Sequence, residues 1–134
     1  KKVLRAEAIV YGRLPLMITE NCLVQNETGC RLDRQGPCVP EDGPCRCGQP
    51  NVLVDRTGAA FPLLPAYGHR TEIQNSKPLY LADRPEHRRL GLAYARLRFT
   101  TETAEECVSV VQNYLDAAPA AGDFTRGLYE RGVE

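Results

Sequence analysis

The chain has 134 residues, which is enough for one domain with one core, and its 43% apolar and 25% charged content is typical of a soluble globular protein. Its 17 basic and 17 acidic side chains give a net charge of zero, which excludes nucleic-acid binding driven by overall charge. The apolar runs are short and are broken by Pro, Gly or Arg, so we expect no membrane span, and the first residues do not resemble a signal peptide.

Residues 6–18 are predicted to form one strand, because β-branched and aromatic side chains cluster there. Pro15 has no N–H to donate, so we expect this strand to bend, or to lie at a sheet edge, near that residue. The chain starts immediately before the strand, and we therefore expect it to be a fragment of a larger protein.

Residues 21–50 are expected to form a long loop that glycine and proline interrupt. Five of the six cysteines lie in it: Cys22, Cys30, Cys38, Cys45 and Cys47. A loop of this length is uncommon unless it is functional or cross-linked. These five thiols cannot all pair with one another, and the sixth, Cys107, lies in a predicted helix. The pattern favours a reducing compartment, so we expect a cytoplasmic protein.

A metal site is one way to order such a loop, because thiolates suit zinc and iron–sulfur clusters. The candidate metal ligands are Cys22, Cys30, Cys45, Cys47 and His69. His69 is included because it follows the predicted hairpin and imidazole is the commonest metal ligand in proteins. The spacing lacks the paired C-x2-C of a zinc ribbon. The alternative therefore stays open that the loop holds free thiols, with one disulfide at most.

Residues 51–65 are predicted to form a β-hairpin whose turn is the segment 55–58, where a glycine can take positive φ. A third short strand is expected at 69–73. Asp83 is then predicted to cap a short helix that ends at Gly91, and we expect His87 to lie on its solvated face.

Residues 92–99 alternate as a half-buried strand does, with Tyr94, Arg96 and Arg98 on one face. If that face is functional, Arg96 and Arg98 are candidate substrate-binding residues, because the guanidinium fork matches a carboxylate or phosphate. The alternative is that the face is covered by other parts of the protein.

The clearest predicted element is a helix over residues 104–118, with a capping box formed by Thr103 and Glu106. Its expected apolar stripe consists of Ala104, Cys107, Val108, Val111, Leu115 and Ala118. We expect Cys107 to be structural and to face the strands. Residues 120–134 show no periodicity and are predicted to be a linker or tail.

The order of elements predicts an α/β fold in which residues 1–134 form a single fragment. The chain is too short for a full barrel, which takes about 250 residues. Strands 6–18 and 92–99 would then lack neighbours and leave apolar side chains exposed, namely Val10, Leu14, Leu16, Leu97 and Phe99. We therefore expect either a homodimer or closure of the gap by the hairpin at 51–65.

Four segments follow one another in the order YGRLPLMITENC (11–22), EIQNSKPLYLAD (72–83), ARLRFTTE (95–102) and FTRGLYERGV (124–133). Together they resemble the collagenase-like peptidase U32 family over essentially the whole chain. The resemblance implies a TIM-like barrel, of which this chain would be a partial fragment with the cysteine-rich loop inserted. It also implies a hydrolase whose remaining parts, in its own parent chain, are this segment's partners.

Some members of that family take part in hydroxylation of tRNA or of ubiquinone precursors and hold an iron–sulfur cluster on four cysteines. Cys22 matches one of those ligands, and one of the later loop cysteines matches a second. Pro15, Leu79 and Tyr80 stand where the other two would lie. The extra cysteines and His69 could rebuild a site of different geometry.

Three functions are compatible with these observations. The first is a U32-type peptidase acting on peptides, of which the isolated fragment is inactive. The second is an iron–sulfur protein that supports hydroxylation of RNA or of a cofactor. The third is a non-enzymatic interaction module stapled by metal or disulfide. The sequence contains no Ser-His-Asp arrangement, HExxH motif or phosphate-binding glycine loop, so it identifies no catalytic residue.

Overall fold

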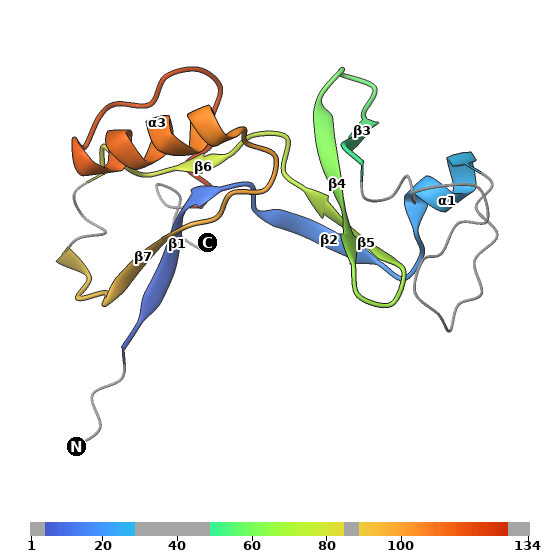
Figure 1. Cartoon of the computed structure of the whole chain (residues 1–134), viewed down its shortest axis with the longest axis horizontal. Coiled ribbons are helices and arrows are strands. Elements are labelled where there is room, and N and C mark those ends of the chain that lie inside the picture. The colour runs from blue at the N-terminus through green and yellow to red at the C-terminus, as the bar shows by residue number, and fades with distance from the viewer. Residues whose placement is uncertain (1–4, 29–48, 85–88, 129–134) are drawn as a thin grey trace. The chain divides into compact units, whose positions relative to one another are not determined.

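The structure, a computed structural model, describes residues 5–28, 49–84 and 89–128 (Figure 1). The chain divides into two compact units, each with its own sheet. Unit 1 comprises Lys1–Leu14 and Lys77–Glu134, and unit 2 comprises Pro15–Ser76. Unit 2 is therefore inserted between two parts of the chain that fold together as unit 1. No helix in the described ranges is long and apolar enough to cross a bilayer.

Unit 1 is built on a three-stranded sheet in the order β6-β1-β7. The central strand β1 (Glu7–Gly12) pairs antiparallel with β6 (Leu79–Tyr80) and parallel with β7 (Tyr94–Leu97). Two adjoining clusters form its core: Val10, Leu79 and Leu81, and Tyr11, Tyr80 and Ala82. The helix α3 (Ala104–Leu115) packs Val110 and Tyr114 against these clusters.

Unit 2 is a four-stranded antiparallel sheet in the order β2-β5-β4-β3, with the short helix α1 (Leu23–Thr28) following β2. The strands are β2 (Pro15–Thr19), β3 (Asn51–Val54), β4 (Ala60–Ala66) and β5 (Arg70–Gln74). Leu63 and Ile73, which are cross-strand partners, are buried. The Leu23 N–H donates to the Thr71 hydroxyl at 3.0 Å, which ties the start of α1 to β5.

The prediction of an α/β partial TIM-like barrel is wrong. Most of the described regular structure is β, neither described sheet closes, and unit 2 is entirely antiparallel. A TIM-like barrel needs parallel strands with a helix after each, whereas β1 has an antiparallel neighbour on one side. The order of elements does not show whether two strands are joined by a hairpin, which makes them antiparallel, or by a crossover, which makes them parallel.

The predicted strand 6–18 is in fact two strands in two different sheets, β1 and β2. The break follows Gly12, which has φ 123°, a backbone conformation that L side chains rarely adopt. A Cβ on Gly12 would also lie 2.1 Å from the Arg98 carbonyl oxygen. The expectation for Pro15 is confirmed, because Pro15 begins β2 at an edge of the unit 2 sheet.

Several local predictions are confirmed. The hairpin is β3–β4, whose turn is closed by the Asp55 carboxylate, and the expected third strand is β5. The helix α3 begins with the predicted capping box, in which Thr103 and Glu106 bond reciprocally. Residues 85–88 of the predicted helix, His87 among them, lie outside the described residues.

The predicted inward stripe of α3 is wrong. Val108 and Leu115 are 70% and 72% exposed, and the helix packs through Val110 and Tyr114 instead. Cys107 carries a free thiol and is only half-buried. Both stripes are apolar, so the pattern alone could not choose between them. Tyr114 decides the orientation, because its ring and hydroxyl find partners inside unit 1.

The expected loss of strand neighbours also does not hold for β1, which is paired on both sides and whose Val10 is 1% exposed. Leu97 and Phe99 pack against the core of unit 1. In unit 2, β2 is paired with β5, which in turn continues into the hairpin. The hairpin therefore joins the sheet of β2, whereas β7 lies at an edge of the unit 1 sheet with β1 as its neighbour among the described strands.

Candidate functional site

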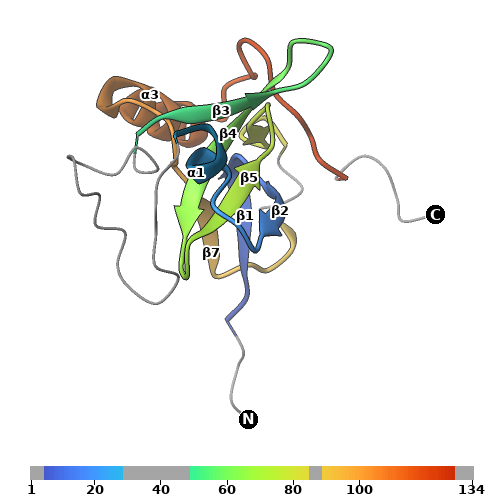
Figure 2. The same ribbon diagram turned by 90° about the vertical axis from the view of Figure 1, so that its right-hand side faces the viewer.

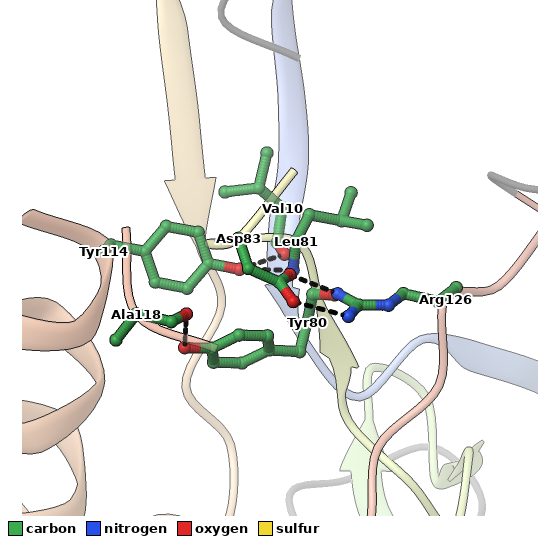
Figure 3. Close-up of polar contacts among 7 residues, drawn as sticks. All are labelled: Val10, Tyr80, Leu81, Asp83, Tyr114, Ala118 and Arg126. Atoms are coloured by element: carbon green, nitrogen blue, oxygen red, sulfur yellow. Dashed lines mark hydrogen bonds and ion pairs between the residues drawn. The ribbon is translucent and has the colours of Figure 1, made fainter. Parts of the chain in front are cut away.

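Tyr80, Tyr114, Asp83 and Arg126 of unit 1 converge where β6 meets the segment that follows α3 (Figure 3). Arg126 forms a bidentate pair with Asp83, at 2.6 and 2.8 Å between guanidinium nitrogens and carboxylate oxygens. The same guanidinium donates to the Tyr80 carbonyl at 2.6 Å and lies 4.5 Å from the Phe124 ring centroid. Such planar, two-point pairing is the strong form of an arginine–carboxylate contact. It fixes the position of β6 relative to residues 124–126.

Within the segment 120–134, predicted as a linker or tail, the described residues around Thr125 contact β6. Thr125 forms a parallel bridge with Leu79, and the Tyr80 N–H donates to the Thr125 carbonyl at 3.1 Å. Asp83, which the sequence predicts to cap a helix at 83–91, binds Arg126 through its carboxylate. Hydrogen bonds from Arg126 hold the pKa of Asp83 below its ordinary value, so this group is ionised at neutral pH.

Tyr114 connects α3 to two strands. Its hydroxyl donates to the Val10 carbonyl of β1 and accepts from the Leu81 N–H, just after β6, at 2.9 Å (Figure 3). Beside it, the Tyr80 hydroxyl donates to the Ala118 carbonyl at 2.9 Å. The two rings lie 5.5 Å apart between centroids. Burial raises the pKa of Tyr114 to about 12 and also raises that of Tyr80.

Tyr11 extends this aromatic cluster along β1. Its hydroxyl donates to the Glu102 carboxylate at 3.3 Å, and its ring lies 5.5 Å from the Phe99 ring. Burial, strengthened by the negative charge of Glu102, raises the pKa of Tyr11 well above its ordinary value. The other Glu102 oxygen accepts from the Thr100 and Thr101 N–H groups at 2.7 and 3.0 Å, which orders the approach to α3.

The chemistry of this cluster follows from its protonation. Three phenols with raised pKa remain protonated at neutral pH and act as hydrogen-bond donors, while Asp83 is engaged by Arg126. Such groups hold backbone segments in place; they are poor proton acceptors. We therefore describe the cluster as a junction that joins β1, β6, α3 and residues 124–126, and call it the tyrosine junction (Tyr11, Tyr80, Asp83, Tyr114 and Arg126).

The sequence did not predict these residues as a group. Tyr11, Tyr80, Asp83 and Arg126 all lie within the segments that carry the family resemblance, and this shared location is the signal that could have found them. Tyr114 lies outside those segments. The pairing of Arg126 with Asp83 joins residues far apart in the chain, so only the tertiary structure could bring it out.

Of the predicted metal ligands, the structure describes Cys22 and His69, both in unit 2. Cys22 is buried, carries a free thiol and directly precedes α1. His69 lies in the turn between β4 and β5 with φ 59°. Cys30, Cys45 and Cys47 lie outside the described residues. Within the described ranges, no group of three or more His, Cys, Asp or Glu side chains could hold a metal ion. The described residues alone therefore do not make a metal centre.

The predicted substrate-binding arginines are both engaged within unit 1. Arg96 is paired with Glu7 of the neighbouring strand at 2.7 Å, and both side chains are largely exposed. Arg98 donates to the Arg13 carbonyl at 3.1 Å. The structure thus directs these two side chains to different partners and does not bring them together on one ligand.

No protein-family model, no curated protein and no solved structure matches this chain.

Proposed function

We propose that this chain is a segment of a U32-type peptidase and that it works as an integral part of that protein. What supports the proposal is that parts of all four resembling segments meet in unit 1, to which residues 11–14 of the first and 77–83 of the second belong. Tyr11, from the first, pairs with Tyr80 of the second and Leu97 of the third. Arg126, from the fourth, binds Asp83 of the second. Segments that fold against one another are more informative than four separate short similarities.

The proposal assigns no catalytic residue to this chain, because the polar groups of the tyrosine junction already bind one another. Within such a peptidase, the tyrosine junction holds the sheet of unit 1 together. The isolated chain is accordingly inactive, and hydrolysis requires the rest of the parent protein.

The test is hydrolysis of a denatured collagen peptide by the parent protein and, separately, by the 134-residue chain. Activity of the parent protein alone supports the proposal, and its loss on Asp83→Asn with retention on Asp123→Asn would trace that activity to an intact junction. A parent protein that folds and leaves the peptide uncut overturns the peptidase assignment.

A second candidate is an iron–sulfur or zinc protein that supports hydroxylation of RNA or of a cofactor. Cys22 favours it, because this buried thiol lies at the start of the helix that leads into residues 29–48, where the sequence places four further cysteines. Thiolates are the ligands that both metals prefer. The described residues do not supply the site by themselves, so no chemical step is assigned to it.

Anaerobic purification with metal analysis and a visible spectrum tests this candidate. Iron with broad visible absorption favours the hydroxylation role, and zinc favours a structural site. Cys22→Ser should lower the metal content, whereas the matched Cys107→Ser, in unit 1, should leave it unchanged. Metal-free protein under these conditions removes the candidate.

We further propose a reducing, cytoplasmic location, which the free thiols of Cys22 and Cys107 support.

A further inference from the structure

The strand β3 lies at one edge of the unit 2 sheet, and among the described strands its neighbour is β4 (Figure 2). Its side chains Val52, Leu53 and Val54 are 56%, 46% and 58% exposed. Natural edge strands are usually protected by charged residues, proline or a bulge, because an open apolar edge pairs with other strands. Residues 51–54 carry none of these features, and their pairing with β4 is regular.

The alternation of hydrogen-bonded and non-hydrogen-bonded pairs in the β3–β4 hairpin shows which backbone groups of β3 face away from β4. The Asp55 N–H donates to the Ala59 carbonyl at 3.0 Å, one residue beyond the Val54–Ala60 pair. In an antiparallel ladder this makes Val54–Ala60 a pair without mutual hydrogen bonds. The Val52–Pro62 pair, two residues along, is of the same kind, which agrees with the missing N–H of proline. The N–H and C=O groups of Val52 and Val54 therefore point away from β4.

A second copy of β3 is complementary to this edge. When two copies run antiparallel with Leu53 opposite Leu53, Val52 of each copy lies opposite Val54 of the other. Both residues direct their N–H and C=O groups outward, so each such pair exchanges two backbone hydrogen bonds. A register shifted by one residue would instead face Leu53, whose groups are bonded to β4.

The charges near the strand agree with this register. Asp55 falls opposite the uncharged Asn51 of the other copy, so no like charges oppose one another. The Asp55 carboxylate is already occupied by Thr57 and the Ala59 N–H, at 2.7 and 3.0 Å. The other edge, β2, is less suitable because it begins with Pro15 and has a register shift between Pro15 and Met17.

We propose that β3 is a dimerisation edge, through which two copies of this chain join their four-stranded sheets into one continuous antiparallel sheet. The seam consists of Val52, Leu53 and Val54 from each copy. This assembly does not depend on the peptidase or metal assignments. It also differs from the dimer expected from the sequence, which relied on strands 6–18 and 92–99.

Sedimentation velocity of the 134-residue chain over a concentration series tests the proposal, and the unaltered chain should approach twice its monomer mass. Val52→Lys places two charges in the seam and should raise the dissociation constant by more than about 100-fold. Val54→Pro removes an outward N–H without removing a bond to β4, and it should have the same effect. Circular dichroism verifies that each variant is folded; if Val54→Pro is not, Val52→Lys decides alone.

Met17→Lys on β2 and Val108→Lys on α3 are the matched controls, because these side chains are 56% and 70% exposed and lie outside the seam. Both variants should dimerise as the unaltered chain does. A chain that stays monomeric at every concentration overturns the proposal. So does a dimer that survives Val52→Lys or that either control abolishes.

Discussion

Single side-chain hydroxyl groups hold segments of unit 1 together by hydrogen bonds to the backbone. Tyr114 is the clearest example, because one hydroxyl satisfies the Val10 carbonyl and the Leu81 N–H, which belong to different parts of the chain. A buried backbone group that loses its partner costs more than the hydrogen bond itself contributes. The stability of unit 1 is therefore unusually dependent on a few side-chain oxygens.

Tyr114→Phe should lower the free energy of unfolding by about 1–3 kcal/mol, because it leaves two backbone groups without a partner and fills nearly the same volume. Urea unfolding monitored by far-ultraviolet circular dichroism measures the change. Tyr94→Phe is the matched control: Tyr94 is 52% exposed and accepts a hydrogen bond only from Arg5 among the contacts described for it. That variant should change stability by less than about 0.5 kcal/mol. Equal effects at both positions would contradict the role given to Tyr114.

Asp83→Asn should destabilise unit 1 by about 1–2 kcal/mol at neutral pH, because it removes the carboxylate that Arg126 binds in a partly buried setting. Arg126 would keep its bond to the Tyr80 carbonyl but would lose its charged partner. The exposed Lys77–Asp123 pair offers a control with the same chemistry, and Asp123→Asn should cost less than about 0.5 kcal/mol.

The Asp83–Arg126 pair should also make the stability of unit 1 depend on pH. The pKa of Asp83 is lowered in the folded state, chiefly by the hydrogen bonds from Arg126. The pair's contribution is therefore fully present above the unfolded pKa of about 3.9 and is lost as the pH falls through the lower folded value. The stability difference between the unaltered chain and Asp83→Asn should shrink over that acidic range. A difference that stays constant down to the lowest pH at which unit 1 remains folded would argue against this pair.

At the scale of the element, the end of β1 depends on a glycine. Gly12→Ala should cost more than about 3 kcal/mol, because the new methyl group would collide with the Arg98 carbonyl at a positive φ. Gly58→Ala separates the effect of the collision from the effect of positive φ. Gly58 also has positive φ, at 85°, but nothing lies within 4 Å of the position that its new methyl group would take. It should therefore cost only about 1 kcal/mol. If thermal unfolding shows comparable losses of stability for the two variants, the structure around Gly12 has adjusted to relieve the collision.

The helix α3 depends on its first turn. Thr103→Ala removes the hydroxyl that accepts from the Glu106 N–H, and it should cost about 1 kcal/mol. Ser109→Ala is the matched control within the helix, since the contact that the described residues give Ser109 is its donation to the Glu105 carbonyl one turn earlier. Alanine favours a helix interior, so that change should be neutral or stabilising in urea unfolding. Destabilisation by Ser109→Ala as large as that by Thr103→Ala would refute the capping argument.

For the whole molecule, the insertion of unit 2 has a direct consequence. Gly12 and Leu79 are cross-strand partners, so the chain leaves and re-enters unit 1 at neighbouring positions. Replacing residues 15–76 by a short glycine-rich turn should therefore give a β1–β6 hairpin and preserve α3. In the shortened chain Tyr114→Phe should cost as much as in the full chain. Loss of cooperative urea unfolding would show that unit 1 needs unit 2 in order to fold.

The hairpin and the start of α3 could be predicted because their signals are local. The Asp55–Gly58 turn and the Thr103–Glu106 capping box each involve a few neighbouring residues, and the structure contains both. The edge position of Pro15 is also a property of one residue, its missing N–H. Such features are determined by sequence because the interacting groups are already close along the chain.

The remaining features depend on contacts between distant residues. The pattern of residues 6–18 does not reveal that the chain changes sheets after Gly12, because both strands are apolar and only the approach of Arg98 requires the break. The two apolar stripes of α3 are equivalent until Tyr114 finds Val10 and Leu81. The sequence by itself therefore determined the turn at 55–58, the cap at Thr103 and the hairpin with the strand that follows it. The tertiary structure decided the sheets, the buried face of α3 and the tyrosine junction, because each depends on partners that only folding brings together.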